Sequence, residues 1–394
     1  MSEQDILIRK SPRKDKRYSK RYNKNKDYHR KHRMSRKKRV ILICVICIVG
    51  ILLAGVAYAA SILLNSDKYD PDTMFRPKAQ SAVPTAAGAA PEESAGPEIG
   101  ENAVQYNGEI YKYNNDMVNV LFMGIDYEKH QGADGEVIAG GQADTLILIA
   151  INTNNHKMTL FNIPRDTMTE IKLYDLNQAY TGTKTAQIAL SHAYGDGKEM
   201  SNELTADAVS NLFYGLPLYR YIALDVAGIP AATDAVGGVT VTAPDDFKLG
   251  KKSVEKGEKL TLDGNQAKIY VQSRDEEELT SNLSRMDRQT SYMKGFFDAV
   301  KTNTKENLLF PVTLYQQIGE YASTDMNLSE IAYVARAALD SGLKDENIFT
   351  VPGNMRQGDN IAEYIVNDDE LYRMILDTFY LKQPSAASTA AAGE

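Results

Sequence analysis

Four charged side chains stand next to the ends of short apolar segments in this sequence: Asp126, Asp144, Arg165 and Asp166. Carboxylate oxygens are ligands that Mg²⁺ accepts while it keeps several waters and phosphate oxygens in its shell. Arginine offers two parallel N–H donors to a phosphate group. Asp126 and Asp144 close to arginines therefore predict a Mg²⁺-diphosphate site. The alternative for each residue is a carboxylate that caps a turn or an arginine on the surface.

A second group of polar side chains lies farther along the chain: Arg274, Arg285, Arg288 and Gln289. Arg285 and Gln289 are four residues apart, so in a helix they share one face. Arginines near the start of a helix are repelled by the positive end of the helix dipole, so they do not stabilise the helix. Their presence there indicates a function such as anion binding, to which the helix N-terminus would contribute. The alternative is that they form salt bridges with the acidic residues 276–278.

A sheet with flanking helices is needed to bring these side chains together. Five short apolar runs have the length and composition of strands: 118–125, 145–151, 157–163, 219–224 and 239–243. Four segments have helical spacing: 185–194, 204–214, 226–236 and 281–301. A capping box at Ser284 and Asp287 is predicted for the last helix. The alternation predicts an α/β fold, an αβα sandwich with a mixed central sheet.

The charge of the chain divides into two unequal parts. The 394 residues hold 45 Lys and Arg and 52 Asp and Glu, a net charge of −7. Residues 1–39 contain 17 of the bases and 4 of the acids, so this head carries +13 and the rest of the chain −20. We predict a basic disordered arm that lies on anionic membrane lipid, and an acidic body that binds no nucleic acid. The alternative for the head is nucleic-acid binding.

Residues 40–64 form a run of 25 residues without a charge. About 20 apolar residues cross a bilayer, so this run predicts one transmembrane helix. The bases precede it, which predicts a single-pass protein of the cell membrane with a cytoplasmic N-terminus and its body outside. The alternative is a cleaved signal peptide, because residues 57–59 (Ala-Tyr-Ala) resemble a cleavage site.

The remaining chain has three predicted parts. Residues 65–105, rich in Ala, Pro, Gly, Ser and Glu, predict a stalk, residues 106–383 one folded body, and residues 384–394 a disordered tail. Cys44 and Cys47 both lie in the predicted membrane helix. The body therefore contains no disulfide, no thiol nucleophile and no cysteine metal site.

The body resembles the LytR-CpsA-Psr family of bacterial cell-envelope proteins through seven ordered motifs: VNVLFMGID (118–126), ADTLILIAIN (143–152), FNIPRDT (161–167), LSHAYGDG (190–197), GVTVTAP (238–244), LDGNQAKIYVQSR (262–274) and LSRMDRQ (283–289). They cover about residues 118–300. The segment up to Tyr380 is compatible with the C-terminal helices of the family, and the head, span and stalk agree with its topology.

The resemblance implies a Mg²⁺-dependent phosphotransferase that is anchored to the membrane and acts outside it. Such proteins move a glycopolymer, such as teichoic acid or capsule, from an undecaprenyl-diphosphate carrier to a muramic-acid hydroxyl of peptidoglycan. The implied fold is an αβα core with an apolar pocket for the polyprenyl tail.

The motifs also imply roles for single residues. Asp126 and Asp144 match the acids associated with Mg²⁺. The implied diphosphate contacts are Arg165, Arg274, Arg285, Arg288 and Gln289. Arg165 and Arg285 are also implied in catalysis, together with Asp166 as a candidate base for the attacking hydroxyl.

The sequence departs from the family pattern at several of these positions. The loop 127–143 has no arginine, Gln142 and Ala143 directly precede Asp144, and Gln272 replaces an arginine. Asn282 stands where an acid is common. Each lost charge-assisted contact costs about 1.5–3 kcal/mol, so two losses weaken substrate capture more than about tenfold. The alternatives to a transferase are a non-catalytic protein that binds a polyprenyl lipid or regulates wall assembly, and a hydrolase that releases the polymer.

Overall fold

The computed structural model describes residues 102–127, 140–218, 220–273, 281–307, 309–359 and 361–384. The predicted head, membrane helix and most of the stalk lie outside these residues, as do Arg274, the acids 276–278 and residues 385–394 of the tail. Within the described residues, no helix is long and apolar enough to cross a membrane.

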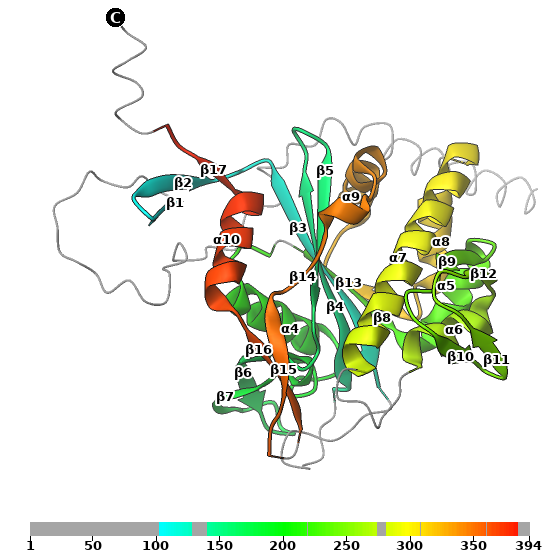
Figure 1. The fold of residues 1–394 in the computed structure, drawn as a ribbon, viewed down its shortest axis with the longest axis horizontal. Coiled ribbons are helices and arrows are strands. Elements are labelled where there is room, and N and C mark those ends of the chain that lie inside the picture. The colour runs from blue at the N-terminus through cyan, green and yellow to red at the C-terminus, as the bar shows by residue number, and fades with distance from the viewer. Residues whose placement is uncertain are drawn as a thin grey trace, which may run out of the picture. The chain divides into compact units, whose positions relative to one another are not determined.

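A six-stranded mixed sheet forms the centre of the fold (Figure 1). Its strands, in spatial order, are β13 (Ala322–Thr324), β8 (Arg220–Asp225), β3 (Met117–Asp126), β4 (Gln142–Asn152), β5 (Lys157–Ile163) and β14 (Ile348–Thr350). Strands β3, β4 and β5 pair antiparallel, whereas β8 and β14 run parallel to their neighbours β3 and β5. The predicted hairpin between β4 and β5 and the mixed sheet are confirmed.

Helices cover both faces of this sheet (Figure 1). They are α4 (Glu199–Leu212) and α10 (Asp368–Phe379) on one face, and α7 (Ser281–Glu306) and α9 (Leu328–Ser341) on the other. Successive side chains of β4 point to opposite faces. Leu148 therefore packs with α4 and α10, and Ile147 with α7 and α9. This arrangement is the predicted αβα sandwich.

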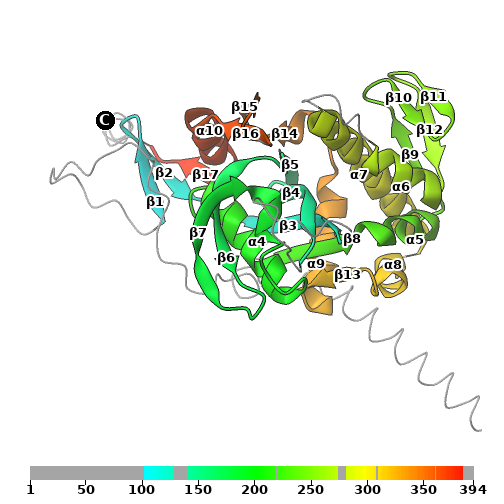
Figure 2. The same cartoon turned by 90° about the horizontal axis from the view of Figure 1, so that it is seen from below.

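A smaller group of elements packs against α7 on the side away from the sheet (Figure 2). It contains α5 (Ile229–Ala235), β9 (Val239–Thr242), β10 (Phe247–Leu249), β11 (Lys252–Val254), β12 (Lys259–Leu262), α6 (Gly264–Gln272) and α8 (Phe310–Ile318). Tyr292 of α7 belongs to the apolar cluster of this group, while Met293 packs towards the sheet. At Gly295 a Cβ atom would lie 2.2 Å from the carbonyl oxygen of Thr240, so only glycine allows the helix this close to β9.

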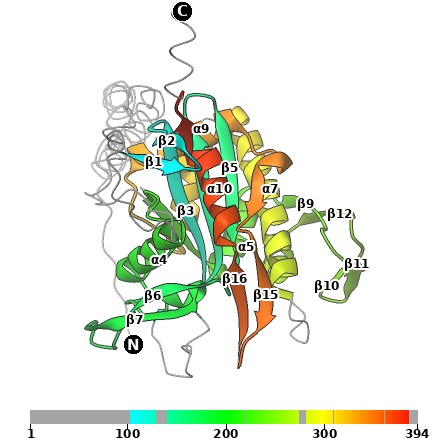
Figure 3. The same ribbon diagram turned by 60° about the vertical axis from the view of Figure 1, so that its left-hand side comes forward.

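Short two- and three-stranded pieces complete the body. They are β1 (Ala103–Tyr106), β2 (Glu109–Tyr113), β6 (Met168–Tyr174), β7 (Tyr180–Gln187), β15 (Gly353–Gln357), β16 (Ala362–Val366) and β17 (Tyr380–Lys382), with short 3₁₀ helices at Ile188–Ser191, Val226–Gly228 and Asp345–Asn347. Figure 3 shows the β6–β7 and β15–β16 hairpins near the same end of the sheet.

Two local predictions are wrong. The segment 185–194 is not one helix, because its first residues complete β7, where they pair with β6, and only Ile188–Ser191 is helical. Ser284 does not cap α7, because the helix already includes Ser281. In addition, β1 begins at Ala103, so the last residues assigned to the stalk belong to the folded body.

Candidate functional site

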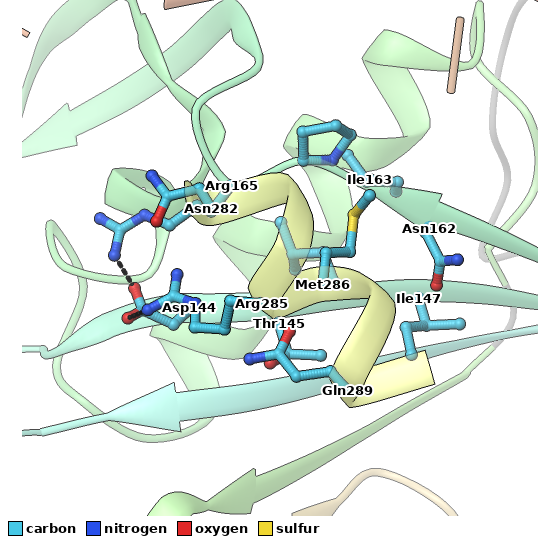
Figure 4. Close-up of a pocket in the computed structure, with 12 residues that line it drawn as sticks. Asp144, Thr145, Ile147, Asn162, Ile163, Arg165, Asn282, Arg285, Met286 and Gln289 are labelled. Atoms are coloured by element: carbon cyan, nitrogen blue, oxygen red, sulfur yellow. Dashed lines mark hydrogen bonds and ion pairs between the residues drawn. The ribbon is translucent and has the colours of Figure 1, made fainter. Parts of the chain in front are cut away.

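A pocket lies where β4 begins and β5 ends, next to the N-terminal half of α7 (Figure 4). It encloses about 330 Å³, including the part open to solvent. Its lining comes from residues 144–147 of β4, residues 162–165 at the end of β5, and residues 282–289 on one side of α7. The neighbouring strands β4 and β5 thus bring Asp144 and Arg165 together, and α7 adds Arg285.

A β-bulge in β4 sets the direction of Asp144. Gly124 of β3 is opposite Thr145, but the next residue of β3, Ile125, is opposite Ala143, so Asp144 is the additional residue. A bulge of this kind bends its strand and re-aims a side chain. Asp126 is opposite Gln142 and therefore stands at the same end of the sheet.

Two guanidinium groups hold the Asp144 carboxylate. Nη1 of Arg165 donates to Oδ1, and Nη1 of Arg285 donates to Oδ2 at 3.4 Å. Nη2 of Arg165 donates to Oε1 of Gln142 at 2.6 Å. Only 10% of the Arg165 side chain and 6% of the Arg285 side chain are exposed. The ionisable groups that line the pocket are thus two cations and one anion, which favours an anionic ligand.

Arg288 lies outside the pocket lining. Its Nη1 donates to Oδ2 of Asp245 and its Nη2 to the carbonyl oxygen of Ser273, and its guanidinium carbon lies 5.4 Å from the centre of the Phe247 ring. Arg288 therefore ties α7 to the end of α6. Gln289 does line the pocket, and its Nε2 donates to the carbonyl oxygen of Val271 at 3.2 Å.

Asp166 is buried behind the pocket, with 2% of its surface exposed. Its Oδ1 accepts from Nε2 of Gln187 at 2.8 Å, and its Oδ2 accepts from Nδ2 of Asn282 at 2.5 Å. The backbone N–H of Tyr364 donates to its carbonyl oxygen. These contacts connect the end of β5 with β7, β16 and α7, and they hold the residue next to Arg165 in place. The geometry fits a positioning role.

The structure gives roles to the residues that depart from the family pattern. Gln142 accepts a hydrogen bond from Arg165, and Asn282 donates to Asp166. Gln187 was missed by the sequence analysis because it was assigned to a helix. Asn162 was also missed, although a polar residue within an apolar strand is a visible signal.

The protein side chains near the pocket would supply only some of the ligands that Mg²⁺ needs, and the substrate and water would supply the others. In the part of the chain that the structure describes, no three His, Cys, Asp or Glu side chains form a cluster that could hold a metal. Mg²⁺ is commonly held by one or two carboxylates together with substrate phosphates and waters. Asp126 and Asp144, on neighbouring strands, are the carboxylates that would fit that arrangement.

His192 supports the segment that leads into β4. Its Nδ1 donates to the carbonyl oxygen of Gly140 at 2.7 Å, and its Nε2 lies 3.2 Å from Oδ1 of Asn202. The side chain is fully buried, and burial lowers its pKa from the ordinary 6.5. His192 is therefore neutral in the native protein at neutral pH.

Comparison with known proteins identifies relatives of this chain. The sequence model of the LytR_cpsA_psr family matches residues 84–378. The polyisoprenyl-teichoic acid–peptidoglycan teichoic acid transferase TagU of Oceanobacillus iheyensis is 28% identical over 274 residues, which are 68% of this chain and 76% of that protein. The transferase of the same name from Bacillus subtilis is 27% identical over 291 residues, 70% of this chain and 80% of that protein.

Solved structures share the fold. The crystal structure of B. subtilis TagV superposes with a TM-score of 0.51 at 21% identity, covering 66% of this chain and 96% of that one. Protein gbs0355 from Streptococcus agalactiae superposes with a TM-score of 0.52 at 20% identity, covering 71% and 95%. The mixed sheet with helices on both faces is thus a known architecture.

We expect replacement of Asp166 by Asn to lower the free energy of unfolding by about 1–3 kcal/mol, because an amide group would then face the amide donors of Gln187 and Asn282. Urea denaturation followed by tyrosine fluorescence measures this loss. Asn282→Ala leaves Oδ2 of the buried carboxylate without this donor and should also cost about 1–3 kcal/mol. An Asp166→Asn protein of wild-type stability that has lost activity would contradict the positioning role and favour a role as base.

We expect His192 to make the protein less stable as the pH falls below 6.5. The unfolded chain binds a proton near the ordinary pKa, whereas the native pKa is lower, so stability is lost as the pH falls towards the native pKa, by at most about 1.4 kcal/mol per pH unit. His192→Gln should remove this part of the pH dependence in denaturation measured from pH 7.5 to 5. His156→Gln, on an exposed turn, is the control. An unchanged dependence in His192→Gln would refute the assignment.

Proposed function

The chain belongs to the LytR_cpsA_psr family, and from that premise we propose that it is an enzyme that transfers a polyprenyl-diphosphate-linked glycopolymer to peptidoglycan. One observation carries this proposal: Arg165 and Arg285 converge on Asp144 in a pocket that is also lined by aliphatic side chains. The transferases named TagU among its relatives support a teichoic acid as the polymer.

The two arginines have the geometry to grip a diphosphate. Phosphoryl transfer depends mainly on positioning and on positive charge near the phosphate oxygens, because negative charge is spread over them in the transition state. Arg165 and Arg285 are already oriented by Asp144, so little ordering remains when the substrate binds. Gln142 holds the second nitrogen of Arg165 in the same plane.

The apolar wall suits the lipid end of the carrier. Ile147, Ile163 and Met286 line the pocket, and Ile147 continues into the apolar cluster between the sheet, α7 and α9. These aliphatic side chains would contact the first part of the polyprenyl chain, next to the diphosphate that the arginines hold.

The proposed reaction is an attack by an acceptor hydroxyl on the phosphorus that carries the glycopolymer. The new bond joins the acceptor oxygen to phosphorus, and the bond to the bridging oxygen breaks, so polyprenyl phosphate leaves with the electron pair. Arg165 and Arg285 stabilise the charge on the phosphate oxygens. Asp166 accepts the hydroxyl proton only if the Asn282 amide moves from Oδ2, because both carboxylate oxygens are engaged.

Asp126 and Asp144 are the residues that would hold Mg²⁺. A bound Mg²⁺ neutralises negative charge on the phosphate oxygens and orients the substrate. Both acids lie at the same end of neighbouring strands, and Asp144 contacts the two arginines.

We propose that the body works outside the cell membrane. The uncharged run 40–64 and the 17 bases before it support a single membrane helix with the N-terminus in the cytoplasm. The basic head would then lie against anionic lipid.

We expect Arg165→Ala to reduce polymer transfer at least about 100-fold, because a donor to the developing phosphate charge is lost. The assay combines the full chain in detergent with Mg²⁺, a polyprenyl-diphosphate sugar and a peptidoglycan fragment. Arg336→Ala, on the exposed side of α9, is the matched control and should keep full activity.

The products of this assay separate the possible activities. A sugar–peptidoglycan conjugate identifies a transferase, free sugar phosphate a hydrolase, and bound but unchanged lipid a binding protein. Normal transfer by a folded Arg165→Ala protein would refute the role of Arg165.

We expect EDTA to abolish transfer and added Mg²⁺ to restore it. Asp126→Asn should raise the Mg²⁺ concentration that gives half of the maximal rate at least about tenfold, because one anionic oxygen ligand is lost. Full activity in EDTA would show that the arginines alone balance the phosphate charge.

A further inference from the structure

An apolar group stands at the tip of the β6–β7 hairpin. Leu176 is the most exposed large apolar side chain of the described residues, with 75% of its surface in solvent, and Tyr180 follows with 58%. The ring of Tyr180 packs against the partly exposed ring of Tyr174, with 5.5 Å between their centres. A single exposed apolar residue is normal, but several at one hairpin tip indicate a contact surface. None of the roles assigned above uses these residues.

The turn that carries Leu176 is held in one conformation by hydrogen bonds. Oδ1 of Asp175 accepts from the backbone N–H groups of Asn177 and Ala179, each at 2.9 Å. The backbone N–H of Asp175 donates to the carbonyl oxygen of Ala179 at 3.0 Å. These contacts turn the polar groups of the turn towards one another and leave the Leu176 side chain outside. The tip is therefore ordered before it meets a partner, which lowers the entropic cost of a contact.

The hairpin starts at the end of the sheet that carries the pocket. Strand β6 begins three residues after Arg165, directly beyond the end of β5, and Figure 3 shows the hairpin at this end. Nε2 of Gln187 donates to Oδ1 of Asp166, which fixes the base of the hairpin beside the pocket. A strand advances about 3.3 Å per residue, so the seven residues of β6 place the tip roughly 20 Å from this base.

We propose that the tip of the β6–β7 hairpin rests in the headgroup region of the membrane, with Leu176 directed towards the hydrocarbon. This inference rests on the proposed function. The polyprenyl chain of the carrier lies in the bilayer, so its diphosphate reaches the pocket only if this end of the sheet lies near the membrane surface. Leucine gains free energy on leaving water, and tyrosine is enriched at membrane interfaces because its ring is apolar and its hydroxyl polar. Residues 65–101, at up to about 3.3 Å each, are long enough to allow this orientation.

Asp175 limits how deep the tip can lie. The hydrogen bonds from the backbone N–H groups of Ala179 and Asn177 lower the pKa of Asp175, so its carboxylate is charged at neutral pH. A charge is costly within the hydrocarbon, so the turn stays at the level of the headgroups. A glycan strand would be bound chiefly by polar side chains around its sugar rings. The most exposed side chain of this tip is aliphatic, which favours lipid as the partner.

Fluorescence of the full chain in vesicles tests the contact. The vesicles contain phosphatidylethanolamine and phosphatidylglycerol, and an environment-sensitive dye is attached to Leu176→Cys after Cys44 and Cys47 are replaced by Ala. The dye should emit at shorter wavelengths than the same dye at Leu328→Cys. Lipids that carry a nitroxide near the headgroup should quench the dye at Leu176→Cys and leave the dye at Leu328→Cys unquenched.

Leu328 is the matched control because it is an exposed leucine at the other end of the sheet. It is the first residue of α9 and 45% exposed. Glu330, two residues later, pairs with Arg220 at the start of β8. Since β8 runs parallel to β3, its start lies at the end of the sheet away from Asp126.

Transfer rates show whether the contact serves the reaction. Leu176→Gln should lower transfer from a long polyprenyl carrier in these vesicles about tenfold, because an apolar anchor is lost, and should lower transfer from a water-soluble geranyl carrier less than about twofold. Leu176→Phe should keep the rate with the long carrier, because its side chain is also apolar. Leu328→Gln should keep both rates. Leu176 lies on an exposed turn, so its variants should unfold at the wild-type temperature.

The outcomes separate this inference from the function that it builds on. If the wild-type chain transfers no polymer from either carrier, the proposed function fails, and the inference fails with it. If the wild type transfers polymer and lipid quenches the dye at Leu176→Cys no more than the dye at Leu328→Cys, only the inference is overturned. A spectral shift that requires a peptidoglycan fragment also overturns it, because the hairpin would then bind the acceptor. Equal loss of transfer from both carriers in Leu176→Gln overturns it as well.

Discussion

The site depends on one carboxylate that is shared by two guanidinium groups. Without Asp144, Arg165 and Arg285 would repel each other in a region that is largely closed to water, and each would lose an anionic partner that directs its guanidinium group. With it, both arginines are held in the lining of the pocket before any ligand arrives. Taking one partner from a buried ion pair is costly, so β4, β5 and α7 must keep their places for the pair to persist.

The long helix α7 keeps its place because it is packed from two sides. One side meets the sheet and the other meets the small group of elements around β9, where Gly295 allows backbone contact. Arg288 adds a polar tie to the end of α6. The helix therefore presents Arg285 and Gln289 to the pocket from a surface that is fixed in both rotation and translation.

Much of this arrangement was predictable, and the reasons for the exceptions are physical. Apolar runs of strand length located β3, β4 and β5, and residue type together with spacing selected Asp144, Arg165 and Arg285. Pairing of β6 with β7 decided the structure of residues 185–187, because long-range strand pairing overrides local helical spacing. Gln142 and Asn282 stand where the family pattern has charged residues, so the sequence predicts lost contacts at both positions. The structure shows instead that Gln142 accepts a hydrogen bond from Arg165 and that Asn282 donates one to Asp166.

The bulge in β4 makes chain length, rather than residue type, decisive at this point. Side chains in a regular antiparallel pair alternate between the two faces, so removing one residue between Gln142 and Leu146 would move Asp144 to the opposite face. If Ala143 or Thr145 were the residue removed, Asp144, Arg165 and Arg285 would all remain, yet the acid would no longer reach the arginines. Two related chains that both keep Asp144, Arg165 and Arg285 can therefore differ in whether these side chains meet. An insertion or deletion at this point of β4 changes the pocket itself rather than a loop.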